Sequence, residues 1–195
     1  MTEQPKHRLL IWPLLVALLV IVLDRVSKFL VVRFLGPSAD VHTIPLFGPF
    51  RLIYLENTGV SFGKLREYST LHVILGLTIA LALSIGFRYL LTSNRWANLA
   101  LGLILGGAWG NMIDRIITAL RDGLDKAYVV DFFDSGFWPV FNVADSAISV
   151  GGVIFGIYLV FFQSRSQEIL AERGVDSRAD EETLWNKAEE PASGE

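Results

Sequence analysis

The segment Leu9–Leu30 reads LLIWPLLVALLVIVLDRVSKFL and is apolar apart from a short polar group near its end. A helix needs about 20 apolar residues to cross the hydrocarbon core of a bilayer, so this segment predicts a transmembrane helix. It lacks the small-residue cleavage site of a secretory signal peptide, and Asp24 and Lys28 stand where such a peptide is apolar or small. We therefore expect a retained helix.

Three further apolar stretches have the length of a membrane span. They are Leu71–Leu91, Trp96–Ile117 and Ala144–Phe162. Together with the first segment they predict an all-α membrane protein with four transmembrane helices. Four spans place both termini and the short loop Thr92–Arg95 on one side of the membrane. Lys and Arg are divided evenly between the two sides, so the positive-inside rule does not decide the orientation.

The other side of the membrane receives two long segments, Val31–Thr70 and Thr118–Val143. The first contains HTIPLFGPFRLIYLENTGVSFG. Its alternation of apolar and polar residues, interrupted by turn residues, predicts a small β-platform. The second contains TALRDGLDKAY, which predicts a polar loop or helix at the membrane interface.

The composition and its distribution support a membrane domain with a polar tail. Hydrophobic residues make up 52% of the chain and charged residues 19%, which is too apolar for an ordinary soluble domain of this length. Residues 167–195 carry nine acids and three bases, a net charge of −6, so the rest of the chain is +3. We expect a membrane domain over residues 1–165 and an acidic, partly disordered tail over 166–195.

Several classes of chemistry find no support in the sequence. The chain has no cysteine, which excludes disulfides, thiolate metal sites and cysteine nucleophiles. It contains no H-E-x-x-H, no G-x-S-x-G and no phosphate-binding glycine loop. No basic face for nucleic acid is evident. We expect neither a metal nor a cofactor.

Polar side chains inside the spans need an explanation, because an ionisable group there costs at least about 2.5 kcal/mol on insertion. Asp24 and Lys28 are four residues apart and so share a helix face, either as a self-neutralising pair or as part of a site. In the third span, Asn111, Asp114 and Arg115 form a second polar group. Asn111 and Asp114 share a face, and Asp114 and Arg115 can neutralise each other or their neighbours.

Glycines and turn residues near these groups have both structural and functional interpretations. The stripe Gly102, Gly106 and Gly110 favours close packing of helices, and a groove for a substrate helix is the alternative. Asn57-Thr58-Gly59 is a turn signal. Asn142 is placed to cap the fourth helix, with Asp145 in its first turn, where a carboxylate complements the helix dipole.

Five separated blocks of the chain, in order, resemble the bacterial lipoprotein signal peptidases, the signal peptidase II family of aspartic intramembrane proteases. The resemblance covers about residues 9–163. The blocks are DRVSK (Asp24, Ser27, Lys28), NTGVSFG (Asn57, Gly59, Phe62), GGAWGNMIDR (Gly106, Gly107, Gly110, Asn111, Asp114, Arg115), VVDF (Asp131, Phe132) and FNVADSAI (Asn142, Ala144, Asp145). The stretch between Arg115 and Asp131 is longer than the family leads us to expect.

The resemblance implies an endopeptidase that removes the signal peptide from prolipoproteins, cutting before a cysteine that carries a diacylglyceryl group. It implies that Asp131 and Asp145 are the catalytic pair and that globomycin-type inhibitors block the enzyme. It also implies a multi-pass protein of the bacterial cytoplasmic membrane, with both termini in the cytoplasm. The two long segments then lie outside, and the first forms a β-cradle on the membrane surface.

Two nearby carboxyls can share one proton, because both cannot ionise at close range. The ionised one takes a proton from water while the neutral one supports the carbonyl oxygen of the substrate. A helix N-terminus favours the charge on Asp145, and apolar neighbours favour the neutral form of Asp131. Asn111 and Asn142 are placed to orient these groups, and Asn57 to hold the substrate backbone or the cradle.

Two other classes of protein remain as alternatives from the residues alone. A small transporter or channel subunit would use the polar cluster to bind a proton or a cation. The spans show no internal repeat, and the two carboxylates lie at span ends rather than at mid-membrane. A membrane scaffold would use the glycine stripe to bind partner helices, but it leaves Asp131 unexplained.

The acidic tail should be dispensable for catalysis. Because its charge and low apolar content give it no means of packing against the membrane domain, a chain ending near Arg173 should insert and cleave as the full chain does. Membrane insertion and cleavage of a lipid-modified prolipoprotein are the measurements. A shortened enzyme that is stable in membranes yet inactive contradicts this expectation.

Overall fold

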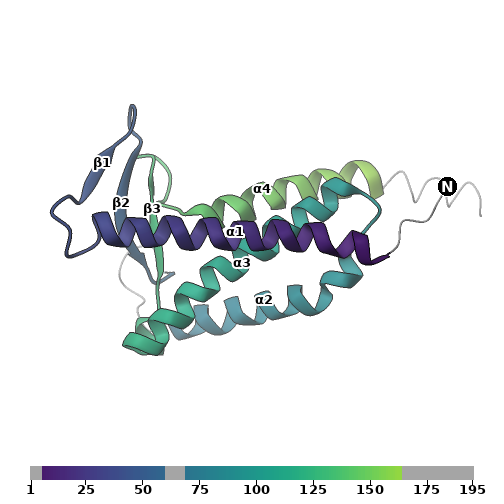
Figure 1. Ribbon diagram of the computed structural model, residues 1–195, viewed down its shortest axis with the longest axis horizontal. Helices are drawn as coiled ribbons and strands as arrows, with labels where there is room; N and C mark the ends of the chain where they lie inside the picture. The colour runs from purple at the N-terminus through teal and green to yellow at the C-terminus, as the bar shows by residue number, and fades with distance from the viewer. Residues whose placement is uncertain (1–5, 60–68, 164–195) are drawn as a thin grey trace, which may run out of the picture. The chain divides into compact units, whose positions relative to one another are not determined.

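The computed structural model describes residues 6–59 and 69–163 (Figure 1). Phe62 of the NTGVSFG block and the predicted tail, 166–195, lie outside the described residues. Contacts within the chain group residues 1–155 into one compact unit, and this unit contains all the site residues discussed below.

Helices form where the apolar stretches predict them, and two of them run further than expected. They are α1 (Lys6–Leu35), α2 (Ser69–Leu90), α3 (Arg95–Asp122) and α4 (Val143–Tyr158), which continues as a π-helical turn, Leu159–Gln163. Helix α3 passes the predicted end at Ile117 because no helix-breaking residue follows until Gly123, whose N–H closes on the carbonyl of Ala119. A 3₁₀ turn, Leu124–Lys126, then occupies the segment predicted as an interfacial patch.

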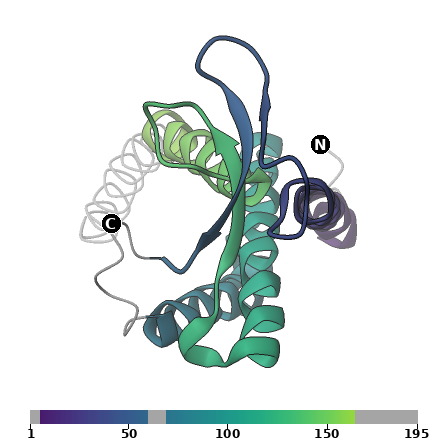
Figure 2. The ribbon, with the colours of Figure 1, turned by 90° about the vertical axis from the view of Figure 1, so that its left-hand side faces the viewer.

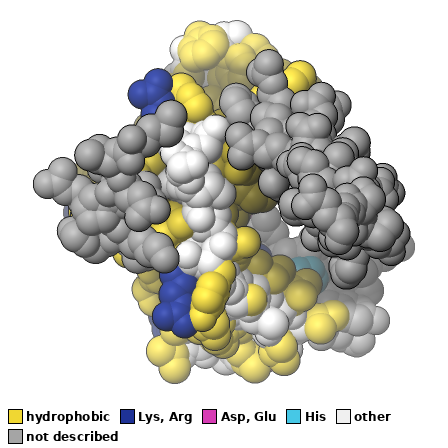
Figure 3. Space-filling model, turned by 90° about the vertical axis from the view of Figure 1, so that its right-hand side faces the viewer, with side chains coloured by type: hydrophobic (Ala, Val, Ile, Leu, Met, Phe, Trp, Pro, Cys, Tyr) yellow, Lys and Arg dark blue, Asp and Glu magenta, His cyan; other side chains and the backbone are white. Residues whose placement is uncertain are grey.

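The distribution of side chains is that of a membrane protein. Two helical stretches, Thr70–Leu90 and Val143–Phe161, are long and apolar enough to cross a bilayer, with mean hydropathies of 2.0 and 1.8. Large apolar side chains on the helices point outward, and Phe29 is 66% exposed. Hydrophobic side chains with a few Lys or Arg also cover much of the described surface at the end where α2 connects to α3 (Figure 3). Such extensive apolar exposure is expected where lipid is the neighbour.

A three-stranded antiparallel sheet lies at the opposite end of the helices and confirms the predicted β-platform. Its strands are β1 (Thr43–Pro45), β2 (Arg51–Asn57) and β3 (Val129–Asp134), in the order β1-β2-β3. Strands β2 and β3 lie side by side and pack against α1, and β3 also packs against α3 (Figure 2).

Strand β3 was not predicted, because its segment was treated as part of a loop. The run VVDFFD is β-branched and aromatic, which suits a strand, but six residues give little sequence signal without a partner. The partner is β2, which lies far earlier in the chain. At one end of the pairing, Asn57 bonds through its side chain to Asp131, 74 residues later. At the other end, Arg51 Nε lies 2.7 Å from Asp134 Oδ2. Asp131 therefore projects from a strand.

The glycine stripe of α3 packs against other helices of this chain, as the structural interpretation predicts. A Cβ on Gly102 would lie 2.5 Å from the carbonyl oxygen of Pro13, and one on Gly106 would lie 2.7 Å from that of Ala17. Both neighbours belong to α1. A Cβ on Gly107 would lie 2.4 Å from the carbonyl oxygen of Ala144 in α4. These contacts bring α1, α3 and α4 close enough for their polar side chains to meet.

The substitution Gly106→Leu should destabilise the protein by pushing α1 away from α3. Overpacking costs about 1–3 kcal/mol or more, and here the obstacle is backbone, which cannot rotate aside. Thermal unfolding in detergent should show a lower Tm. Gly152→Leu is the matched control, because a Cβ on Gly152 meets nothing within 4 Å. Equal Tm values for the two variants would show that the glycine stripe is not needed for the packing of α1 against α3.

Candidate active site

A buried lysine lies at the centre of the polar residues. Lys28 Nζ in α1 is 2.7 Å from Asp24 Oδ2 and 2.9 Å from Asp114 Oδ2, and it donates a hydrogen bond to Asn111 Oδ1 at 3.1 Å. The side chain of Lys28 is only 1% exposed. Two of these contacts are ion pairs with carboxylates, and the third is a hydrogen bond to an amide oxygen. The predicted pair of Asp24 and Lys28 is therefore real, and it extends to α3.

Asp114 connects α1, α3 and β3. Its carboxylate forms an ion pair with Arg25 as well as with Lys28, and its Oδ2 accepts a hydrogen bond from the backbone N–H of Val130 at 3.2 Å. Arg25 was not predicted to take part in the site, although it directly follows Asp24 in the DRVSK block. The ion-pair partners of Asp114 are thus Arg25 and Lys28, and not its neighbour Arg115.

Asp24 also stabilises the start of α4. Its Oδ1 accepts a hydrogen bond from the N–H of Ala144 at 3.0 Å, so that a carboxylate from α1 satisfies one of the free N–H groups at the helix N-terminus. Ala144 itself is fully buried, and its Cβ would be 3.1 Å from a Cβ on Gly110. A residue larger than glycine at position 110 would therefore press on Ala144 and Asp24.

Asn142 caps α4 as predicted. Its Oδ1 accepts from the N–H of Asp145 at 2.9 Å, and Asp145 Oδ2 accepts in return from the N–H of Asn142 at 3.2 Å. This reciprocal arrangement is a capping box, and it fixes the position of the Asp145 carboxylate in the first turn.

Three asparagines bring Asp131 and Asp145 into one hydrogen-bonded network. Asn111 Nδ2 donates to Asp145 Oδ1 at 2.7 Å. Asn142 Nδ2 donates to Asp131 Oδ1 at 2.6 Å, and Asn57 Nδ2 donates to Asp131 Oδ2 at 2.7 Å. Asn142 Nδ2 is also 3.1 Å from Asn111 Oδ1, which joins the two halves. The structure thus links Asn57, Asn111 and Asn142, which the sequence named, directly to these two aspartates.

Asp131 is 1% exposed, and its surroundings disfavour its charge. Burial raises the pKa of Asp131 to about 6, and the nearby charge of Asp145 acts in the same direction. The hydrogen bonds from Asn57 and Asn142, and the charge of Lys28, act against this rise. Asp131 therefore stays protonated at pH values where an exposed aspartate is fully ionised.

Arg115 and Gly59 were also predicted to support the site. The half-buried guanidinium of Arg115 interacts electrostatically with Asp145, Asp131 and Asp114. Within the described part of the chain, its side chain forms no hydrogen bond. Gly59 follows Asn57 in a turn with φ of 87°.

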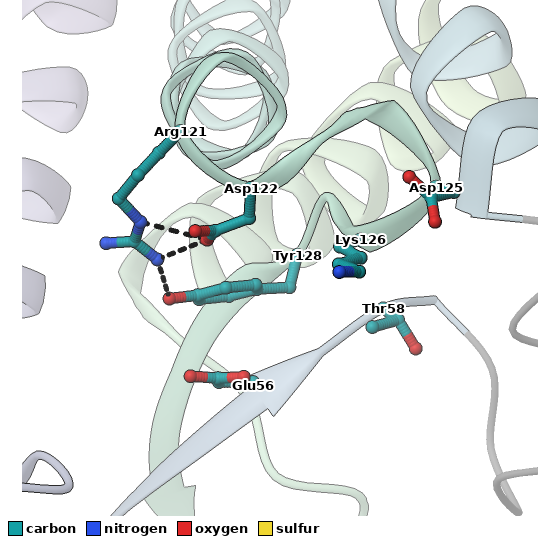
Figure 4. Close-up of a pocket in the computed structure, with 7 residues that line it drawn as sticks. All are labelled: Glu56, Thr58, Arg121, Asp122, Asp125, Lys126 and Tyr128. Atoms are coloured by element: carbon teal, nitrogen blue, oxygen red, sulfur yellow. Dashed lines mark hydrogen bonds and ion pairs between the residues drawn. The ribbon is translucent and has the colours of Figure 1, made fainter.

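A separate cavity of about 570 Å³ lies beside the end of β2 (Figure 4). Its lining includes part of the stretch between Arg115 and Asp131, and the residues are Glu56, Thr58, Arg121, Asp122, Asp125, Lys126 and Tyr128. Arg121 Nη2 donates to Asp122 Oδ2 and to the Tyr128 hydroxyl, each at 2.6 Å. Acidic and basic groups both line this cavity, and neither Asp131 nor Asp145 lines it.

The network can support acid–base chemistry with water. Burial raises the pKa of one carboxyl, Asp131, to about 6, and a second carboxyl, Asp145, accepts hydrogen bonds at both oxygens at the start of a helix. Within residues 6–59 and 69–163 no three His, Cys, Asp or Glu side chains are grouped so as to hold a metal ion.

Comparison with known proteins agrees with this geometry. The family described as signal peptidase (SPase) II matches residues 16–161. A lipoprotein signal peptidase of Moorella thermoacetica is 39% identical over 77% of this chain and 90% of its own length. One of Clostridioides difficile is 40% identical over 79% of this chain and 98% of its own length.

Two solved structures of bacterial membrane enzymes share the fold. A bacterial membrane enzyme determined by the in meso method at 2.3 Å superposes with a TM-score of 0.64 at 26% identity, over 78% of this chain and 90% of that one. A second, at 1.9 Å, gives 0.63 at 26% identity, over 77% of this chain and 93% of that one. The chain belongs to the signal peptidase II family.

Proposed function

We propose that the protein is an aspartic endopeptidase that removes the signal peptide from diacylglyceryl-modified prolipoproteins, cleaving before the lipid-modified cysteine. Membership of the signal peptidase II family supports the substrate class, since the relatives carry the name lipoprotein signal peptidase. The observation that carries the mechanism is the pair of aspartates joined through Asn142, with Asp131 buried and Asp145 at the start of a helix.

In this mechanism Asp145 is the ionised partner and Asp131 the protonated one. A water oxygen attacks the carbonyl carbon of the scissile peptide bond, and Asp145 takes a proton from that water. The Asp131 O–H donates a hydrogen bond to the carbonyl oxygen as negative charge develops on it. When the C–N bond breaks, the leaving amine takes the proton from Asp145. Water is consumed, and both carboxyls return to their starting state.

Arg115 and the asparagines support this chemistry. Arg115 interacts electrostatically with both aspartates, and its N–H donors can hold the backbone of the substrate near the reacting carbonyl. Asn111 and Asn142 hold the two carboxyls, and Asn57 holds Asp131 from the strand side. Because the side chain of Asn57 bonds to Asp131 and to Gly59, its contacts support a role in holding the β-cradle and Asp131 in place more than a role in binding substrate.

The proposed setting is the bacterial cytoplasmic membrane. All four helices span it, with Asp24 and Lys28 of α1 turned inward and neutralised, both termini in the cytoplasm and the sheet forming a cradle at the outer face. Residues 1–165 form the peptidase domain, and 166–195 form a cytoplasmic tail. The substrate's acyl chains and signal helix remain in lipid while water reaches the bond. Globomycin-type inhibitors compete for this site.

Replacement of either aspartate should abolish cleavage. Asp131→Asn and Asp145→Asn keep the size of the side chain but remove its acid–base function, so cleavage of a lipid-modified prolipoprotein should fall by at least about a thousandfold. The double variant should be scarcely worse than either single one, because the pair acts as a unit.

Asp134→Asn is the matched control, since Asp134 lies on the same strand and pairs with Arg51 instead. It should cleave normally, and all variants should retain the thermal stability of a folded protein. If Asp131→Asn or Asp145→Asn cleaved at a near-normal rate, the two-carboxylate mechanism would be wrong and Asp114 would be tested next.

Asp24→Ala should act mainly on stability. The change leaves Lys28 with one charged partner fewer and removes a hydrogen-bond acceptor from the start of α4, a loss of about 3 kcal/mol for a broken buried pair. We expect lowered protein levels in membranes and partial activity per molecule. Asp40→Ala, at an exposed position, is the control. Normal levels with no detectable turnover would instead place Asp24 among the catalytic groups.

A further inference from the structure

The amide of Asn57 has a defined orientation. Its Oδ1 accepts a hydrogen bond from the backbone N–H of Gly59 at 2.8 Å. A backbone N–H can only donate, so the amide must turn its oxygen toward Gly59 and its NH₂ group away. The NH₂ group then donates to Asp131 Oδ2 at 2.7 Å. Gly59 thus determines that Asp131 receives a donor from Asn57.

The turn that supplies this N–H depends on glycine. Gly59 has φ of 87°, a conformation that other residues rarely adopt. A Cβ on Gly59 would also lie 2.9 Å from ring atoms of His72. Any other residue at this position must shift the backbone, and the N–H would move with it.

The sheet register places Asn57 beside Asp131. Asn57 is opposite Val129, and Asp131 is opposite Leu55, so Asn57 and Asp131 are diagonal neighbours on one face of the β2–β3 pair. Asn57 is the last residue of β2, and its partners are Gly59 and Asp131. Asn111, by contrast, donates to Asp145. Each aspartate therefore has an amide donor of its own, in addition to the contacts of Asn142.

We propose that Asn57, held by the N–H of Gly59, is a positioning residue that sets the protonation equilibrium of Asp131 and so the pH at which the enzyme loses activity on the alkaline side. The inference rests on the proposed function, in which Asp131 is the partner that must keep its proton. The turn Asn57-Thr58-Gly59 then helps to control the protonation of Asp131, in addition to any part it has in shaping the β-cradle.

The direction of the effect follows from the donor. An N–H donor stabilises the ionised carboxylate more than the neutral acid, so the hydrogen bond from Asn57 lowers the pKa of Asp131 against the opposing effect of burial. Removing the donor should raise that pKa above its value of about 6. The enzyme should then keep the proton on Asp131, and its activity, to higher pH.

Other charged groups facing Asp131 come from three elements and remain in place in an Asn57 variant. They are Lys28 of α1, Arg115 of α3 and Asp145 of α4. The expected shift is therefore that of one hydrogen bond to a charged group, which corresponds to about one pH unit.

The test compares Asn57→Ala and Asn57→Leu with the unaltered full-length enzyme in detergent. The leucine variant keeps the approximate shape of the side chain without a donor. The first measurement is the pH dependence of kcat/KM on a synthetic diacylglyceryl-modified peptide. The second is the carboxyl C=O stretching band of Asp131, titrated by infrared spectroscopy and assigned by its loss in Asp131→Asn. The alkaline midpoint of kcat/KM and the infrared midpoint should both move up by about one pH unit.

Two further variants separate this role from a structural one. Gly59→Ala keeps Asn57 but displaces the N–H that orients it, so it should shift both midpoints in the same direction by a smaller amount. Asn111→Ala removes the donor to Asp145 and reaches Asp131 only through Asp145 and Asn142, so it should lower kcat and move the infrared midpoint of Asp131 less than the Asn57 variants do.

Three results would overturn the inference. An infrared midpoint that stays in place in both Asn57 variants shows that the amide does not tune Asp131. A uniform loss of activity at every pH shows a structural role. A shift of the acidic midpoint alone shows that Asp131 is the base. The infrared titration does not depend on turnover, so an unaltered enzyme that fails to cleave the peptide counts against the proposed function and leaves the test of Asn57 intact.

Discussion

The ammonium group of Lys28 is the interaction on which the rest of the site depends. It is a full charge with no access to water, and three oxygens from two helices compensate it. Two of those oxygens belong to carboxylates that have further tasks, since Asp24 caps α4 and Asp114 holds the backbone of β3. A single buried cation thus fixes α1, α3, α4 and β3 relative to one another. The cost of burying it is offset only when all of these elements are in place.

The three asparagines of the site each direct an NH₂ group at one of the two aspartates. Each amide can present either its oxygen or its NH₂ group, and an unambiguous donor decides which: Lys28 for Asn111, the N–H of Asp145 for Asn142, and the N–H of Gly59 for Asn57. All three NH₂ groups consequently point at the carboxyls. Among the described residues, no Lys or Arg forms an ion pair with Asp131 or Asp145. In the proposed mechanism, a proton shared by the two carboxyls limits their repulsion.

The surface of the helices complements this interior. Charged and amide side chains are buried among the helices, while large apolar side chains such as Phe29 face outward. This arrangement is stable only where lipid surrounds the helices, because exposing so many large apolar side chains to water would cost free energy. The sheet lies at the end of the helices, where polar backbone can meet water. The proposed function places the site formed by α1, α3, α4 and β3 at the boundary between lipid and water, where a lipid-anchored peptide and a water molecule would both reach it.

The sequence by itself determined the helices, their approximate ends, the pairing of Asp24 with Lys28 and the cap at Asn142, because each depends on spacing within one segment. It also pointed to Asp131 and Asp145 through the resemblance of its blocks. Strand β3, the ion pair of Arg25 with Asp114 and the contact of Asp24 with α4 were decided only by the tertiary structure. These features join residues far apart in the chain, up to 120 positions between Asp24 and Ala144. Their energies depend on a partner that a local pattern does not contain, and the orientation of each amide depends on the same partners.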